Sequence, residues 1–442
     1  MSSSKSKAPA FSRQERTLLF LLAAIQFTNI VDFMIMMPMG DLLQKALTIT
    51  PAKYGWLVSS YGLAAGLTAF LGVFYLDNID RKKALLTAYA GFMLGTLASA
   101  IVPNTDSAEL NYWLFIGTRV LTGITGGLLG GLVLSIVGDV IPIERRGRAM
   151  GVITIAFSLA SIIGVPIALT LVDLFDQNWH VPFYGVSLLS LPVWILGFKY
   201  IPALNAHLLN RKEVYNRFDT IRLAFTLPAQ RSSLLFSMLL ILGQFTVVVF
   251  MTPYMINNVG LEQSQIKYIY LVGGGCTVLS GFFIGKLVDR IGRYRVFTIF
   301  AFASVITLIT ITHLPESPLW VVLPITGMFF IFISGRMIPA NTITSSVVLP
   351  QYRAGFMSLN SASMSFASGL SGVIAGSIVS QASEHSPILN YDKVGYLATG
   401  ATLIALFIVR RLKKIGESQT PGQRSGTIIP REISYPPPSG SA

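Results

Sequence analysis

Twelve stretches of about 20 mainly apolar residues follow one another along the 442-residue chain, and each is long enough to cross a bilayer as an α-helix. Only 12% of the residues are charged, whereas a soluble domain has about 25%. This pattern excludes a soluble multidomain enzyme, a disordered scaffold and a disulfide-bonded mini-protein, and it predicts an all-α polytopic membrane protein. The expected spans are residues 17–39, 55–75, 84–103, 112–137, 149–171, 181–200, 232–256, 267–287, 295–313, 319–347, 354–380 and 394–411.

The lysines and arginines are distributed unevenly between the loops, and this distribution predicts which side of the membrane each loop faces. If both termini are cytoplasmic, the cytoplasmic segments contain 27 of the 33 Lys and Arg residues, whereas the opposite side contains four and the spans contain two. Topology therefore explains the net charge of +13, and the charge does not indicate a nucleic-acid partner.

The segments outside the spans divide the chain into regions. Residues 1–16 are expected to form a cytoplasmic tail, and residues 201–231, which contain five Lys and Arg residues, a cytoplasmic linker. The linker separates two predicted bundles at residues 17–200 and 232–411. Residues 412–442 are rich in Pro, Ser and Gly, a composition typical of a disordered tail.

Four landmarks recur in the same order in the two halves of the chain. They are residues 26–28 and 244–246, residues 77–83 and 285–295, Arg119 and Arg336, and residues 146–150 and 353–357. Matched landmarks in one order predict two six-span halves with the same orientation, a repeat found in one large class of transporters.

The second of these landmarks carries a family resemblance. Residues 285–295 read Gly-Lys-Leu-Val-Asp-Arg-Ile-Gly-Arg-Tyr-Arg, and this loop resembles the Gly-x-Leu-x-Asp-Arg-x-Gly-Arg-x-Arg motif of the major facilitator superfamily at every fixed position. The N-terminal copy keeps Asp77 and Arg81 but departs from the motif at Asn78 and Asp80. The resemblance covers residues 15–412. It implies twelve transmembrane helices in two pseudo-symmetric six-helix bundles around a central cavity.

Spans four and five resemble the efflux members of this family. Arg119-x-x-x-Gly123 is similar to a motif of proton-driven members, and Gly164-Val165-Pro166 is similar to the antiporter motif without its following Gly-Gly pair. Residues 179–183 resemble the Trp-Arg-x-x-Phe of sugar- and drug-efflux permeases, with His180 in place of the arginine. The chain thus resembles the twelve-span drug:proton antiporter branch, close to arabinose-efflux-permease-like proteins.

In this family, charged loops lock one face of the transporter closed and release it during alternating access. The resemblance assigns this latch to charged residues at the cytoplasmic ends of the spans. They are Asp77, Arg81 and Asp139 in the first half, and Asp289, Arg290 and Arg293 in the second. Anchoring by positive charge alone is the alternative, and it would explain the cations but not the aspartates.

Asp32 is the only acidic residue well inside a predicted span, about 22 Å from the start of its helix. A carboxylate at such a depth costs at least about 2.5 kcal/mol and normally faces a cavity or a partner. Burial favours its neutral form, so it can exchange a proton near physiological pH. We interpret Asp32 as the residue that binds a proton or attracts a cationic substrate. The alternative is a neutral aspartate, hydrogen-bonded beside Gln26 and Asn29, that fixes helix packing.

Arg119 and Arg336 are the two basic residues inside predicted spans. An arginine keeps its charge when buried, so each needs a partner or a water-filled cavity. The resemblance implicates Arg119 in proton transfer, and a snorkelling arginine near the interface is the alternative. Two roles stay open for Arg336: attraction of an anionic or hydroxyl-bearing substrate in a central pocket, or pairing with Asp32 across the two halves.

Amide and aromatic side chains within the spans are further candidates for pocket lining. They are Asn29, Gln244, Tyr254, Asn341 and Asn360. The glycine-rich stretches of spans four and eight favour close helix packing, and without a Walker lysine they do not predict a nucleotide site. One cysteine and four scattered histidines give no metal-ligand spacing, so neither a metal nor a cofactor is predicted.

These residues and the resemblance together predict a secondary active transporter that exports a small molecule, such as a drug or a sugar, in exchange for protons. A proton-coupled symporter that takes up a sugar or another metabolite is the alternative, because the residues indicate coupling better than direction. A membrane-embedded enzyme would need clustered His, Cys or carboxylate residues, and a receptor would leave the paired loop motifs unexplained. The resemblance implies a monomer in the bilayer of the cell inner membrane, with protons and a small molecule as ligands.

Overall fold

The computed structural model describes residues 11–76, 79–103, 105–202, 204, 217–348, 352–383 and 386–418. This part of the chain is helical apart from connections and one isolated bridge between Ser380 and Leu389. The first group of elements is α1 (Arg13–Ile35), α2 (Gly40–Ala46), α3 (Pro51–Tyr75), α4 (Arg81–Ala100), α5 (Ala108–Val140), α6 (Ile143–Leu159), the π-helix η2 (Ala160–Gly164), α7 (Val165–Leu174) and α8 (Val181–Tyr200). The second is α10 (Arg217–Thr226), α11 (Pro228–Asn257), α12 (Gln263–Ile291), α13 (Arg293–Thr312), α14 (Leu319–Ser346), α15 (Arg353–Ile378) and α16 (Tyr391–Ser418).

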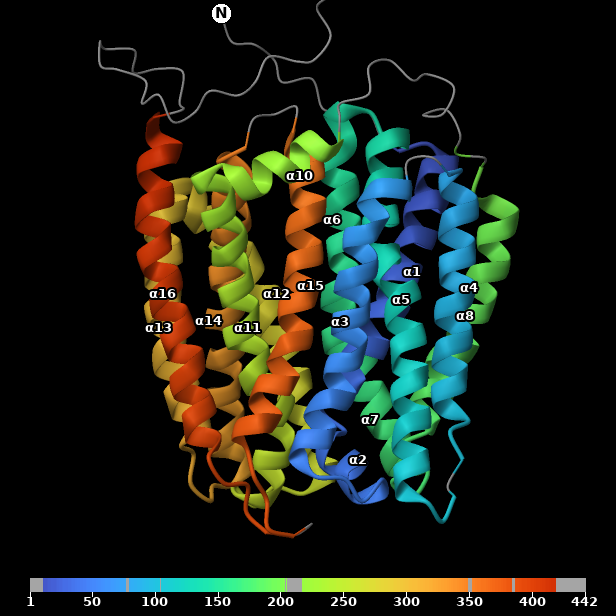
Figure 1. The fold of residues 1–442 in the computed structure, drawn as a ribbon, viewed down its shortest axis with the longest axis vertical. Helices are drawn as coiled ribbons and strands as arrows, with labels where there is room; N and C mark the ends of the chain where they lie inside the picture. Colours follow the sequence, from blue (N-terminus) through green and yellow to red (C-terminus); the bar gives the residue numbers. More distant parts are fainter. Residues whose placement is uncertain are drawn as a thin grey trace, which may run out of the picture.

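Ten helical segments of the described chain are long and apolar enough to cross a membrane, with α6, η2 and α7 counted as one. Helices α4 and α15, which cover the predicted spans 84–103 and 354–380, are not among the ten. Helix α4 begins with three basic residues, and α15 is rich in serine and glycine. Both run alongside the other long helices in Figure 1. The all-α membrane fold is confirmed, while the number of twelve crossings stays a prediction.

Capping residues mark where two of the helices begin, and a glycine marks where a third ends. Ser12 caps α1 in a capping box with Glu15, and Thr50 caps α3, which has Pro51 in its first turn. Gly292 separates α12 from α13 with a φ of 89°, a backbone conformation that L side chains rarely adopt. The motif at residues 285–295 is therefore the last turns of α12, a glycine break and the first turn of α13.

Two short helices lie where the sequence predicted only connections. Helix α2 follows α1 at one end of the molecule, and α10 lies within the predicted linker, of which residues 203 and 205–216 are outside the described residues. Helix α1 begins and α16 ends at the end opposite α2 (Figure 1). We call these the α2 end and the terminal end.

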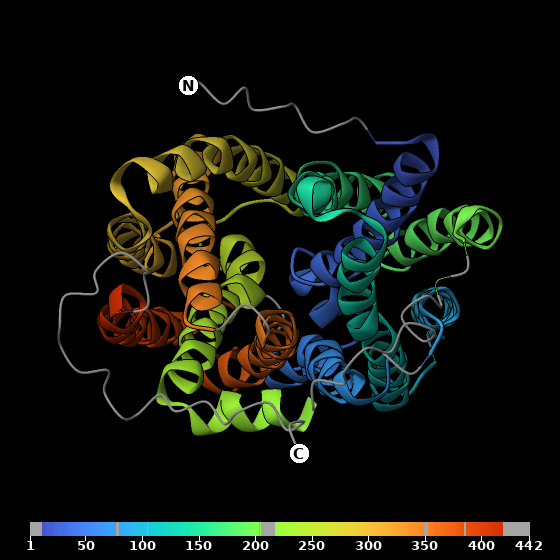
Figure 2. The same ribbon diagram turned by 90° about the horizontal axis from the view of Figure 1, so that it is seen from above.

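Viewed from above, α1 to α8 lie on one side and α11 to α16 on the other, and α3 and α15 meet between them (Figure 2). Glycines on both helices allow this contact. A Cβ added to Gly62 would lie 2.7 Å from the Cα of Gly369, and one added to Gly55 would lie 2.3 Å from the carbonyl oxygen of Gly372. Small residues at such positions let two backbones pack directly against each other.

A second contact between the two groups involves the π-helix. The predicted span 149–171 is not one α-helix, because η2 interrupts it immediately before Pro166, whose ring cannot continue a regular helical hydrogen-bond ladder. On the facing helix α12, a Cβ added to Gly274 would lie 3.0 Å from the backbone nitrogen of Ile162. The interrupted helix thus packs on α12 across the two groups.

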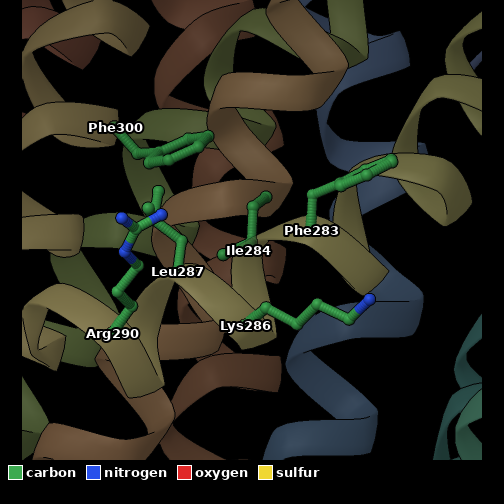
Figure 3. Close-up of a pocket in the computed structure, with 6 residues that line it drawn as sticks. All are labelled: Phe283, Ile284, Lys286, Leu287, Arg290 and Phe300. Atoms are coloured by element: carbon green, nitrogen blue, oxygen red, sulfur yellow. The ribbon is translucent and has the colours of Figure 1, made fainter.

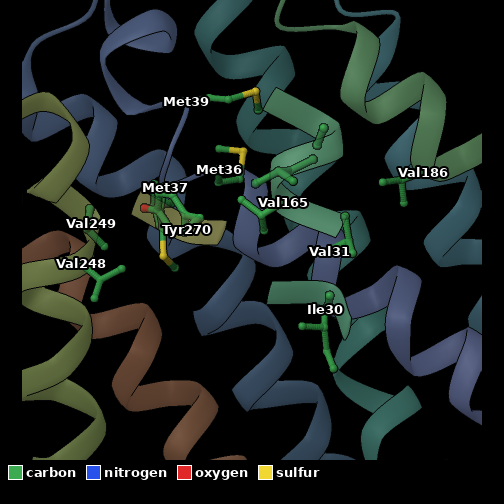
Figure 4. Close-up of a cluster of buried hydrophobic side chains, with 14 of the residues drawn as sticks. Ile30, Val31, Met36, Met37, Met39, Val165, Val186, Val248, Val249 and Tyr270 are labelled. Carbon is green, nitrogen blue, oxygen red and sulfur yellow. The ribbon is translucent and has the colours of Figure 1, made fainter. Parts of the chain in front are cut away.

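The α2 end is closed by packing and by hydrogen bonds between the groups. Met36, Met37 and Met39 follow α1 and share one buried cluster with Val249 of α11 and Tyr270 of α12 (Figure 4). Flexible methionine side chains suit such an irregular junction. The hydrogen bonds across it are Asn257 to Asp41 at 2.6 Å, Lys267 to Asp173 at 2.8 Å, Gln263 to the Pro38 carbonyl at 3.4 Å and Tyr54 to the Val249 carbonyl at 3.5 Å.

Candidate functional site

Asp32 of α1 and Arg119 of α5 form an ion pair inside the α1–α8 group. Both side chains are completely shielded from solvent, with an exposed fraction of 0%. Arg119 Nη1 donates to Asp32 Oδ1 at 3.2 Å, and Nη2 donates to Asp32 Oδ2. A guanidinium and a carboxylate attract each other most strongly in such a two-point contact. The two charged residues that the sequence placed in separate spans are thus one site.

Thr96 of α4 completes the surroundings of the carboxylate, because its hydroxyl donates to Asp32 Oδ1 at 3.1 Å. Arg119 Nε has no hydrogen-bond partner among the described residues. Removing one member of a buried ion pair leaves an uncompensated charge and typically costs about 3 to 5 kcal/mol. A proton that neutralised Asp32 would therefore change the local free energy strongly.

Two aromatic rings enclose the Arg119 guanidinium. Its carbon lies 5.3 Å from the ring centre of Tyr61 on α3 and 5.5 Å from that of Phe183 on α8. The hydroxyl of Tyr61 donates to Asn29 Oδ1 at 2.8 Å, and Asn29 Nδ2 donates to the Gly126 carbonyl at 3.4 Å. These contacts connect helices α1, α3 and α5 around the ion pair, and they fix where Tyr61 lies.

The site reaches the second group of helices through Phe33, one residue after Asp32. The Phe33 ring lies 5.4 Å from the Tyr61 ring and 5.6 Å from the ring of Phe245 on α11, measured between centres. Tyr61 also belongs to the glycine-lined contact with α15, since Gly62 follows it. A displacement of Arg119 would therefore act on residues at the junction of the two groups.

Arg336 of α14 is as completely buried as Arg119, but neutral acceptors surround it. Its Nη1 donates to Ser304 at 3.0 Å and to Thr402 at 2.8 Å, and its Nη2 donates to the Leu240 carbonyl at 3.2 Å. These groups come from α13, α16 and α11, so the guanidinium is held inside the second group. The proposed pairing of Arg336 with Asp32 is not present, because Arg119 occupies both carboxylate oxygens.

The five residues expected to line a pocket have different surroundings. Asn29 is joined to the ion pair through Tyr61, as described above. Asn360 is buried, and its Oδ1 has no hydrogen-bond partner in the described chain. Gln244 is half-buried and Asn341 is exposed. Tyr254 donates at 3.0 Å to a carbonyl of the α13–α14 connection at the α2 end, so the structure does not bring all five together.

The first predicted latch is formed in part. Arg81, at the start of α4, makes an ion pair with Asp139 at the end of α5. Arg146 donates to the Gly138 carbonyl at 2.5 Å, which reinforces the same corner. Asp77 lies outside the described residues. Arg81 opens the helix that covers the third predicted span, so this ion pair joins the start of the third span to the end of the fourth. The relay expected between the ends of the second and fourth spans stays a prediction.

The second latch is arranged differently. Asp289 and Arg290 are exposed on the last turn of α12, and Asp289 has no ion-pair partner among the residues that the structure describes. The Arg293 guanidinium lies 5.2 Å from the neighbouring Tyr294 ring. The sequence explains why the second half has no equivalent of the Arg81–Asp139 ion pair. Asp139 stands seven residues before Arg146, whereas Ser346 stands seven residues before the matching Arg353. The repeat therefore lacks the counterpart of Asp139.

Sequence reasoning missed three residues of the site: Thr96, Tyr61 and Phe33. A threonine and two aromatic residues are common in membrane helices, so composition gives no signal for them. Their neighbours in the sequence give a weak signal, since Phe33 follows Asp32 and Tyr61 precedes a glycine. Their roles depend on contacts between residues that lie far apart in the chain.

A family model described as Major Facilitator Superfamily matches the chain twice, over residues 22–238 and residues 233–435. An uncharacterised MFS-type transporter of Bacillus subtilis (strain 168) is 22% identical over 412 residues, which cover 91% of this chain and 98% of that protein. A probable sugar efflux transporter of Helicobacter pylori (strain P12) is 24% identical over 400 residues, covering 89% of this chain and 94% of that protein.

Solved structures share the fold. The crystal structure of a D-xylose-proton symporter matches with a TM-score of 0.71 at 16% identity, covering 88% of this chain and 96% of that one. The crystal structure of the nucleoside transporter NupG matches with a TM-score of 0.67 at 17% identity, covering 91% of this chain and 100% of that one. At these identities the likeness extends to the fold alone.

Proposed function

The chain belongs to the major facilitator superfamily, and we propose that it is a proton-coupled transporter that exports a small molecule by alternating access. The observation that carries the proposal is the fully buried Asp32–Arg119 ion pair beside the junction of the two helix groups. A membrane carboxylate with a single cationic partner can exist in two charge states, and transport needs such a switch. Asp32 is the proton site, and Arg119 stabilises its ionised form.

The chemistry at the site follows from the contacts. When Asp32 is ionised, Arg119 and Thr96 hold it in place through three hydrogen bonds. When Asp32 takes a proton, the guanidinium loses its counter-ion and must find water or another acceptor, because a buried unpaired cation is costly. Proton binding therefore favours a conformation in which water reaches Arg119.

The change is transmitted to the two helix groups through Tyr61. Its ring packs on the guanidinium, and Phe33 bridges it to Phe245 of the second group. A substrate bound between Phe33 and Phe245 would compete with the packing that the ionised state requires. Aromatic faces and the amide of Asn29 suit a sugar or another neutral, partly apolar molecule. The similarity to a probable sugar efflux transporter of Helicobacter pylori supports the same class.

The positive-inside rule orients the transporter. The terminal end holds most of the basic residues and becomes the cytoplasmic face, with both termini in the cytoplasm of a cell whose inner membrane holds the chain as a monomer. The α2 end then faces outward. Because hydrogen bonds close the α2 end, we assign the conformation to the inward-facing side of the cycle.

The test uses energised cells that express the full chain and carry a panel of labelled sugars and lipophilic fluorescent cations. Efflux is measured with and without a protonophore, for the wild type, Asp32→Asn and the matched control Asp106→Asn, which changes an exposed carboxylate. We expect protonophore-sensitive efflux in the wild type and the control, and none in Asp32→Asn. Efflux that survives in Asp32→Asn contradicts the proton site, and protonophore-sensitive accumulation of a sugar reverses the direction in favour of symport.

A second readout needs no substrate. Spin labels are attached at Ala46→Cys and Glu262→Cys, two exposed positions on opposite sides of the α2-end junction, in a Cys276→Ser background. Their distance distribution is measured across a pH series. We expect the distribution to change with pH in the wild type and to be independent of pH in Asp32→Asn.

A further inference from the structure

A pocket of about 290 Å³ lies beside the terminal end of α12 and is separate from the Asp32 site. It combines apolar and basic side chains from α12 and α13 (Figure 3). They are Phe283, Ile284, Lys286, Leu287, Arg290 and Phe300. The proton site does not use any of these residues, and the latch expected at Arg290 has no ion-pair partner among the described residues.

The apolar floor of the pocket, formed by Phe300 and Ile284, packs closely against α14. A Cβ added to Gly335 of α14 would lie 2.2 Å from the Phe300 ring and 2.9 Å from the Ile284 side chain. Only a glycine at this position leaves room for both apolar side chains. The floor is therefore packed against α14 next to Arg336.

The pocket faces away from the first group of helices. Gly274 marks the side of α12 that packs on η2, and Phe283 stands nine residues later, which is about half a turn around the helix axis. Phe283 is 70% exposed. A large apolar side chain exposed on the outer side of a membrane helix is expected to contact lipid.

The two kinds of side chain are ordered along the membrane normal. Phe283 stands three residues before Lys286 and seven residues before Arg290 on α12, so its Cα lies about 5 to 10 Å deeper than the Cα atoms of the two cations. In Figure 3 the Arg290 side chain extends toward Phe300, while Lys286 extends on the side of Phe283. The cations thus flank an apolar surface and lie nearer the terminal end.

This arrangement matches one type of ligand. A phospholipid carries its charge at the membrane surface and its chains below it, and basic pockets between helices on the cytoplasmic side bind anionic head groups. Lys286, Arg290, Arg293 and Arg295 outnumber Asp289 in this segment, so the local charge is positive. We propose that the pocket binds an anionic phospholipid of the cytoplasmic leaflet, with its phosphate on Lys286 and Arg290 and an acyl chain along Phe283.

A soluble anion would use only half of this surface. The phosphate of a free metabolite would find the two cations, but the exposed Phe283 and the apolar floor would have no role. The apolar contact therefore selects a lipid as the occupant, and the experiment compares a lipid with inorganic phosphate.

The test measures lipid retention by the purified full chain with native mass spectrometry after exchange into phosphatidylglycerol or phosphatidylcholine. We expect the wild type to retain phosphatidylglycerol selectively. Lys286→Gln/Arg290→Gln should weaken this binding about twenty-fivefold, since each cation near a membrane surface contributes about fivefold. The matched control is Arg410→Gln/Arg411→Gln, which removes two exposed cations of α16 at the same end and should leave the retention unchanged.

Further arms test the apolar half and the alternatives. Phe283→Ala keeps both charges and should weaken retention severalfold while size-exclusion behaviour stays the same. Inorganic phosphate in millimolar excess should not displace the lipid. Equal retention by wild type and Lys286→Gln/Arg290→Gln would overturn the proposal, as would an equal loss in the α16 control or displacement by phosphate. If the double variant fails to fold, the single variant Lys286→Gln, which changes one exposed side chain, provides the same comparison with a smaller expected effect.

Discussion

Lys267 of α12 donates a hydrogen bond of 2.8 Å to Asp173 of α7 across the junction between the two groups of helices. Their side chains are 23% and 18% exposed, so water screens the pair only in part. The pair lies at the α2 end, where the groups are also joined through Asp41 and Asn257. Opening this end requires that the pair separates, and the contact therefore stabilises the conformation in which it is closed.

Lys267→Met is expected to shift the conformational equilibrium toward an open α2 end by about fivefold, because a partly exposed ion pair contributes up to about 1 kcal/mol. The measurement is the distance distribution between spin labels at Ala46→Cys and Glu262→Cys in a Cys276→Ser background. The longer distances should gain population in the variant.

The control for this experiment is Lys45→Met. Lys45 pairs with Asp41 at 2.8 Å within α2, so its loss removes an ion pair at the same end without removing a contact between the groups. Its distance distribution should match that of the wild type. A Lys267→Met distribution that also matches the wild type would contradict a latching role for the pair.

Gly62→Leu is expected to weaken the contact between α3 and α15. Even a Cβ at this position would lie 2.7 Å from the Cα of Gly369, and backbone atoms cannot move aside as a flexible side chain can. Overpacking of this kind typically costs about 1 to 3 kcal/mol, and the thermal unfolding temperature in detergent should fall.

The matched control for the glycine contact is Gly130→Ala in α5. A Cβ there meets no atom within 4 Å, and replacing a helical glycine by alanine stabilises a helix by about 1 kcal/mol. Its unfolding temperature should stay constant or rise. If Gly62→Leu melts at the same temperature as the wild type, α3 and α15 do not pack as closely as described.

The sequence predicted the helices and the charged residues better than it predicted their contacts. Hydropathy identifies a membrane helix from a local window, and for this reason most predicted spans match observed helices. It does not identify η2, because residues 160–164 are equally apolar in an α-helix and in a π-helix. It also misses α2, a seven-residue helix that is shorter than any hydropathy window.

The candidate site shows the same limit. Burial of Asp32 and Arg119 follows from their positions in apolar segments, but their pairing does not, because 87 residues separate them in the chain. Arg336 was equally eligible as a partner by sequence. The choice is made by helix packing, which places α5 beside α1 and surrounds Arg336 with α11, α13 and α16. A pairwise contact of this kind is a property of the folded chain.

Asp32→Asn is expected to lower the thermal stability as well as to abolish coupling. The change leaves the Arg119 guanidinium buried without a counter-ion, which typically costs about 3 to 5 kcal/mol. Asp32→Asn/Arg119→Gln removes both charges and should recover most of this loss, although it should not restore transport. Unfolding temperatures of the wild type, both single variants and the double variant give the coupling energy. Additive effects of the two changes would show that the residues do not interact.

The last prediction concerns pH and His180, which lies in the connection between α7 and α8. Burial lowers the pKa of His180 below its ordinary value of 6.5, because it disfavours the charged imidazolium. The ring packs against Trp179 at 3.7 Å between centres, and its Nδ1 lies 3.0 Å from the Ala100 carbonyl, to which a neutral ring donates. The folded protein thus favours the neutral form of His180.

The sign of the effect follows from linkage. The unfolded chain binds a proton at His180 more readily than the folded chain, so the stability contribution is complete above pH 6.5 and is lost as the pH falls below it toward the lowered pKa. Between about pH 8 and about pH 5, the unfolding temperature of the wild type should therefore fall more steeply than that of His180→Gln. The control is His313→Gln, which changes an exposed histidine at the end of α13. The unfolding temperature of this variant should fall as steeply with pH as that of the wild type. Parallel curves for the wild type and His180→Gln would exclude His180 as the source of the acid sensitivity.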